Sequence, residues 1–218
     1  MEAAGSEPMA AEAAAARGAG SRMRDWTATF VMLSSAPALA LSFTAIAPVL
    51  QLIAAHFGPD GRPALTLPLV GLAIDGPLFA QLISTLPSVG LILGGPPVGL
   101  AIDRLGARAV LVWAAILFAL LGAAGAVIDD AALLLAARLA LGFSAVGYGA
   151  ATVALIGARF ADRGRARALA YRNLLGGVGG FLAMRAAGLL GEAGGWHGPV
   201  TLYLIVLAIV PLTLATVP

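Results

Sequence analysis

Two arginines lie inside long apolar stretches of this sequence, where a permanent positive charge is costly. Arg138 and Arg185 are each surrounded by Ala, Leu and Gly. If both guanidinium groups face a cavity within a membrane, they would bind an anionic substrate through charge-assisted hydrogen bonds. The same side chains could instead extend along their helices and place their charge at the outer interface. The sequence leaves both interpretations open.

A few uncharged polar residues share these apolar stretches. Tyr148 and Asn173 are candidates for the lining of a cavity, together with Gln51, Ser84 and Thr85. In lipid, such groups more often form hydrogen bonds between helices. No Asp or Glu lies deep in an apolar stretch, so the sequence lacks an obvious carboxylate for proton coupling.

A charged loop follows the second apolar stretch and reads Gly99-Leu-Ala-Ile-Asp103-Arg104-Leu-Gly106-Ala-Arg108. Asp103 is expected to end a helix, where a carboxylate faces the negative end of the helix dipole. It therefore needs a cationic partner, and Arg104 or Arg108 is close enough to serve. Gly106 permits a tight turn, and Gly99 leaves a notch into which another helix could pack.

An intramembrane serine protease would also place polar residues in apolar helices. Ser144 lies in the fourth apolar stretch, but Ala145 follows it where such enzymes have Gly. His56 and His197 lie at the ends of apolar stretches rather than within them, so no base would reach the serine. We therefore expect no enzymatic activity.

The candidate residues must be positioned by helices that cross a membrane. Hydrophobic residues make up 60% of the 218 residues and charged residues 11%, whereas about a quarter of a soluble domain is charged. About 20 apolar residues cross the hydrocarbon of a bilayer. The sequence predicts an all-α polytopic membrane protein with six such stretches: Trp26–Ala55, Pro77–Ile102, Ala109–Val127, Ala131–Ala158, Ala168–Gly191 and Pro199–Val217.

Two segments lie outside these spans. Residues 1–25 are rich in Ala, Gly and Glu and are expected to be a flexible cytoplasmic tail. The apolar segment Leu65–Ile74 is too short to cross the membrane, so we expect a loop or an extension of the second helix. The string VGLAID at Val70–Asp75 recurs at Val98–Asp103, but the first copy lacks the basic residues that follow the second. We interpret this repeat as chance.

The arginines also predict the orientation of the chain. All 13 basic residues are Arg, and they concentrate before the first span, between the second and third, and between the fourth and fifth. The positive-inside rule places these three regions in the cytoplasm, so both termini are expected inside a cytoplasmic membrane. No polar domain presents the arginines to a nucleic acid.

The loop at Gly99–Arg108 resembles the signature loop of the major facilitator superfamily, G-x-x-x-D-(R/K)-x-G-R-(R/K), at the turn where that family carries it. Ala107 replaces the usual first basic residue after the second glycine. In the family, this loop holds the two halves of the transporter together on the cytoplasmic side. The resemblance implies an inward gate formed by Gly99, Asp103, Arg104, Gly106 and Arg108.

Three weaker motifs agree with this resemblance. Arg138-Leu-Ala-Leu-Gly142 is similar to the family's R-x-x-q-G motif and adds Gly142 to the candidate substrate site. Residues 160–167 resemble the basic loop that follows it, and Gly195-Trp196-His197 resembles Gly-Trp-Arg. Ala183-Met184 stands where drug/proton antiporters have a Gly-Pro pair, which weakens that interpretation.

The resemblance implies a secondary transporter that moves a small molecule by alternating access. Such a transporter has twelve helices in two halves, each built from two inverted three-helix repeats. This chain supplies the N-terminal half, so we expect a truncated sequence, or else a second copy that serves as the other half. A non-transporting membrane scaffold is the alternative, although it would not need the signature loop. The expected partners are the lipid bilayer, the second half and a substrate that is anionic if the two intramembrane arginines bind it; no cofactor or metal is indicated.

Overall fold

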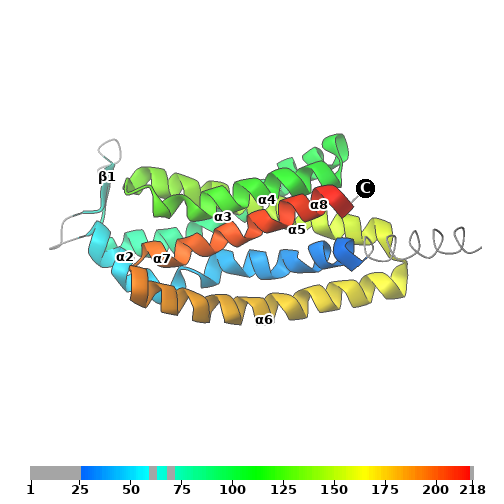
Figure 1. The fold of residues 1–218 in the computed structure, drawn as a ribbon. Helices are drawn as coiled ribbons and strands as arrows, with labels where there is room; N and C mark the ends of the chain where they lie inside the picture. Colours follow the sequence, from blue (N-terminus) through cyan, green and yellow to red (C-terminus); the bar gives the residue numbers. More distant parts are fainter. Residues whose placement is uncertain (1–25, 59–62, 68–71, 217–218) are drawn as a thin grey trace, which may run out of the picture.

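The computed structural model describes residues 26–58, 63–67 and 72–216, so the expected tail at residues 1–25 lies outside the described residues. Six helices in this part of the chain are long and apolar enough to cross a membrane, which confirms the all-α polytopic fold. They lie side by side in one bundle, and residues 26 and 216 lie at the same end of it (Figure 1). The six spans are Trp26–Phe57, Gly76–Leu105, Ala107–Ala126, Ala131–Arg159, Asp162–Gly194 and His197–Thr216.

The first span is interrupted near its C-terminal end. A helix at residues 26–44 is followed by the short 3-10 helix η1 (Ala47–Val49) and by α2 (Leu50–Phe57). Pro48 lies in the first turn of η1, where its missing N–H costs least. The Leu41 carbonyl before the break accepts bonds from the Ala45 amide and the Tyr203 hydroxyl. Backbone groups close to the interruption are thus satisfied within the bundle, as lipid requires.

The core of the bundle is the contact between α3 (Gly76–Leu105) and α5 (Ala131–Arg159), with α4 (Ala107–Ala123) packed against α5. The close approach of α3 and α5 depends on Gly90 and Gly142. A Cβ added to Gly142 would lie 2.8 Å from the Gly90 Cα and would also collide with the Pro87 carbonyl oxygen. Small residues permit such contacts between helices in lipid, where no hydrophobic force drives association.

Aspartates begin both of these helices. Asp75 precedes α3 and accepts a bond from the Leu78 amide at 2.9 Å. Asp130 precedes α5 and accepts one from the Leu133 amide at 2.8 Å. Each carboxylate therefore satisfies an amide that the first helical turn leaves without a partner, which is a structural role.

The segment between α2 and α3 differs from the expectation. Strands β1 (Leu65–Leu67) and β2 (Leu72–Ile74) pair antiparallel, with Leu65 opposite Ile74. The predicted loop or helix extension at Leu65–Ile74 was therefore wrong. Because Asp75 caps α3 at its start, the preceding residues cannot join that helix, and β1 and β2 bond to each other instead. Ile74 is buried in the same cluster as residues of α2 and α3.

The last two spans complete the bundle. The fifth span is α6 (Asp162–Gly194), and the sixth consists of α7 (His197–Val200), η4 (Thr201–Ala208) and α8 (Ile209–Thr216). α6 forms an edge of the bundle (Figure 1), and 17% of its most apolar stretch is buried, against 50% for α5. It contacts the first span through Gly176 and Gly180, which face Ala36 and Ala40. α6 extends beyond the predicted Gly191, so Glu192 belongs to the helix rather than to the connection.

Candidate functional site

The signature loop is a one-residue turn. α3 ends at Leu105, α4 begins at Ala107, and Gly106 between them has a φ of +84°. Glycine adopts this backbone conformation without the strain that a Cβ would bring, which agrees with the tight turn expected there. A Cβ added to Gly99 would meet nothing within 4 Å. The notch expected at Gly99 is therefore open in the described part of the chain.

The charged residues of the loop do not form the expected pair. Asp103 and Arg104 are exposed, and neither forms an ion pair with another described residue. Arg108 donates instead to the Leu214 carbonyl oxygen at 2.9 Å. This carbonyl lies in the last turn of α8, where the helix itself offers no donor. The predicted partnership of Asp103 with Arg104 or Arg108 was wrong, and the carboxylate remains available to another molecule.

Arg138 lies in the core rather than on a cavity. Its side chain is 1% exposed, its Nη1 donates to the Tyr203 hydroxyl at 3.3 Å, and its guanidinium lies 5.6 Å from the centre of the Tyr203 ring. The Tyr203 hydroxyl in turn donates to the Leu41 carbonyl at 2.9 Å. Arg138 thus links α5 to the first and sixth spans, and its guanidinium is buried rather than extended to an end of the helix. Tyr203, which completes this chain of bonds, was missed by the sequence analysis.

The other α5 candidates are buried as well. Gly142 lies at the contact with α3, and Tyr148 is fully buried with its ring 6.3 Å from that of Phe118 on α4. The structure therefore brings all three candidate residues of α5 into helix packing.

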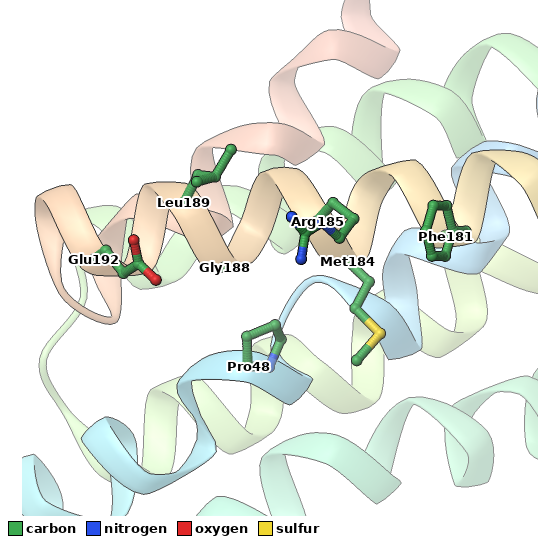
Figure 2. A pocket seen from close by; sticks show the side chains of 7 residues that line it. All are labelled: Pro48, Phe181, Met184, Arg185, Gly188, Leu189 and Glu192. Carbon is green, nitrogen blue, oxygen red and sulfur yellow. The ribbon is translucent and has the colours of Figure 1, made fainter.

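Arg185 has different surroundings. It lines a hollow of about 350 Å³ between α6 and η1 (Figure 2). Arg185 and Glu192 are both exposed, and neither forms a hydrogen bond or an ion pair with another described residue. Asn173, the remaining candidate on α6, is exposed but outside the hollow. The lining residues are Pro48, Phe181, Met184, Arg185, Gly188, Leu189 and Glu192.

Arg172 is an interior cation whose role the sequence analysis did not find. Its Nε donates to the Ser35 hydroxyl at 2.9 Å, and its Nη2 would lie 3.6 Å from a Cβ added to Gly149. It therefore links α6 to the first span beside α5. The only sequence signal was its place just beyond a run of arginines, where it reads as another cytoplasmic charge.

At the opposite end of the bundle from the signature loop, two histidines from different helices lie near one carboxylate. Asp129 Oδ1 lies 3.4 Å from His197 Nε2 and 3.7 Å from His56 Nε2. The Trp196 ring packs on the His197 ring with 3.9 Å between their centres. The three side chains are partly exposed, and a histidine forms an ion pair only when it is protonated, so the contribution of these contacts to stability is small. No group of His, Asp or Glu within the described ranges has the arrangement of a metal site.

The family model described as Major Facilitator Superfamily matches residues 32–218, a range that contains the signature loop, both intramembrane arginines and the hollow. The chain is about half the length of a full protein of that family. No curated protein matches the chain.

Proposed function

The chain belongs to the Major Facilitator Superfamily, and from this premise we propose that it forms one six-helix half of a secondary transporter that carries a small molecule by alternating access. Proteins of this family are membrane transporters rather than enzymes, and the six apolar helices make the chain a multi-pass membrane protein. We infer that the signature loop forms a gate, that a second half packs against α3 and α6, and that α6 carries a surface that faces the substrate.

The state of the signature loop carries the proposal. Asp103 is close to the C-terminal end of α3, where the helix dipole disfavours a carboxylate, and no described residue neutralises it. A donor from another element would stabilise it. The bond from Arg108 to Leu214 ties the start of α4 to the end of α8, so the loop moves with its own half. We infer that Asp103 and Arg104 contact the second half on the cytoplasmic side and hold one conformation until that contact breaks.

Glycines on two helices support a surface for the second half. A Cβ added to Gly95 or Gly99 on α3, or to Gly177 on α6, would meet nothing within 4 Å. Helix faces with small residues permit close approach of another helix in lipid. A second six-helix half is proposed to pack there, either as another part of the same protein or as a second copy of this chain.

The proposed orientation puts the signature loop in the cytoplasm. Arg104 ends the second span and Arg108 begins the third. Arg163, Arg165 and Arg167 begin the fifth, and arginine favours the cytoplasmic face. Both termini then lie inside a cytoplasmic membrane. Arg185 lies in the outer half of α6, and its exposed guanidinium is suited to the anionic group of a substrate.

Uptake by vesicles that contain the chain tests this function. With a panel of radiolabelled small organic acids, we expect uptake above that of empty vesicles and at least a tenfold fall for Asp103→Asn, with insertion unchanged. Asp75→Asn is the matched control, because Asn also caps a helix and Asp75 lies at the other end of the bundle. Unchanged uptake by the Asp103 variant would refute the gate, and absence of uptake by the unmodified chain would refute transport by two copies of this chain.

Because the chain contains no Cys, a single Arg104→Cys variant tests the orientation. A thiol reagent that does not cross membranes should label it only from the cytoplasmic side, and labelling from outside would contradict the proposal.

A further inference from the structure

We propose that the hollow between α6 and η1 binds a small zwitterion, with Arg185 contacting its anionic group and Glu192 its cationic group. This inference rests on the transporter function proposed above and deepens it, because it names the class of substrate. Three features of the hollow favour such a ligand: the spacing of the two charges, their lack of partners and the apolar surface between them.

The two charges face the same space. Arg185 and Glu192 are seven residues apart on α6, which is close to two helical turns and separates their Cα atoms by about 10.5 Å along the axis. Figure 2 shows the guanidinium and the carboxylate on the side of α6 that faces Pro48 of η1. Both line the hollow of about 350 Å³, a volume in the range of sites for small molecules. One hollow therefore offers a cation at one end and an anion at the other.

Neither charge is neutralised by the described residues. The two more buried arginines of the spans have hydrogen-bond partners: Arg138 bonds to Tyr203 and Arg172 to Ser35. Arg185 has none within the described part of the chain, and neither has Glu192. Direct pairs along a helix form between residues three or four positions apart, so a seven-residue spacing does not favour mutual neutralisation. An unpaired cation within a membrane span is costly, and the anionic group of a bound ligand would neutralise it.

The surface between the charges is apolar and has space. Gly188 lies between Arg185 and Glu192, and a Cβ added to it would meet nothing within 4 Å. The remaining lining residues, Pro48, Phe181, Met184 and Leu189, carry no charge. This arrangement fits a molecule with charged ends joined by an apolar chain. A simple anion would leave Glu192 without a partner, so the hollow should prefer a ligand that carries both charges.

The preference can be measured with three ligands of matched chain length. 6-Aminohexanoate carries both charges, hexanoate only the anionic group and hexylamine only the cationic group. Binding to the purified chain in lipid nanodiscs is measured by displacement of radiolabelled 6-aminohexanoate, with empty nanodiscs as the control for partitioning into lipid. Since a hydrogen bond to a charged group contributes about tenfold or more in affinity, 6-aminohexanoate should bind at least about tenfold more tightly than either analogue.

Two variants test which residue binds which charged group of the ligand. Glu192→Gln should lower the affinity for 6-aminohexanoate about tenfold, to that of hexanoate, and leave hexanoate binding unchanged. Arg185→Gln should lower the affinity for 6-aminohexanoate to that for hexylamine and leave the affinity for hexylamine unchanged. The matched controls, Asp162→Asn and Arg167→Gln, remove the same charges at the other end of α6, outside the hollow, and should change none of the three affinities.

Equal affinities for the three ligands, or no specific binding of any, would overturn the proposal. Zwitterion binding that neither variant changes would also overturn it, and would assign Arg185 and Glu192 to contacts with the second half. The uptake experiment with Asp103→Asn depends on the signature loop and not on these two residues. If organic acids are taken up while the preference for a zwitterion is absent, only the substrate class is wrong.

Discussion

The helices α5 and α6 follow each other in the chain, and the sequence assigned candidate substrate residues to both. On α5, Arg138, Gly142 and Tyr148 are all buried in contacts with other helices. On α6, Asn173 and Arg185 are exposed, and Arg185 lines a hollow. The place of a helix in the bundle therefore determines whether an intramembrane arginine packs between helices or faces a hollow. A cation in the core holds helices together, whereas the same residue at the edge can face a ligand.

The strongest test of this difference is truncation of the two arginines. Arg138→Ala leaves a cavity in the core and removes the donor to Tyr203, so we expect the free energy of unfolding to fall by about 2–5 kcal/mol. Arg185→Ala removes an exposed side chain that has no partner among the described residues, and it should change the free energy of unfolding by less than about 0.5 kcal/mol. Tryptophan fluorescence during unfolding in mixed detergent micelles measures both values. Equal stability of the two variants would remove the distinction between α5 and α6.

A smaller effect is expected when a methyl group is added to one glycine of each helix. In Gly142→Ala the new Cβ collides with the backbone of α3, so the free energy of unfolding should fall by about 1–3 kcal/mol. Gly177 on α6 has open space, and alanine favours a helix over glycine by about 1 kcal/mol, so Gly177→Ala should be neutral or slightly stabilising. The same unfolding experiment compares them. A stable Gly142→Ala variant would mean that α3 and α5 are not held at this distance.

The overall architecture could be predicted because its signals are local. Length and apolarity define a membrane span, and the fourth span was predicted at Ala131–Ala158 and observed at Ala131–Arg159. The resemblance of the loop at Gly99–Arg108 was sufficient to indicate the family that the comparison then showed. Gly106 was assigned to a tight turn, and its positive φ agrees with that assignment.

Features that depend on distant parts of the chain could not be predicted. α5 is apolar on all sides, so its sequence does not indicate that Arg138 faces Tyr203, which lies 65 residues away. Arg108 is close to Asp103 in sequence, yet it bonds to a carbonyl of the last helix. The hairpin before α3 arises from pairing between two short strands, and the sequence of either strand alone does not indicate that pairing. The additional turn of α6 places Glu192 on the hollow, and this was visible only in the structure.

Thiol accessibility distinguishes a water-filled surface on α6 from the packed core formed by α5. The chain contains no Cys, so Gly188→Cys in the hollow and Ala145→Cys in the core form a matched pair of small substitutions. In lipid vesicles, a charged methanethiosulfonate reagent should modify Gly188→Cys rapidly and leave Ala145→Cys unmodified until the protein is unfolded. An unreactive Gly188→Cys would place this face of α6 against lipid and contradict the account.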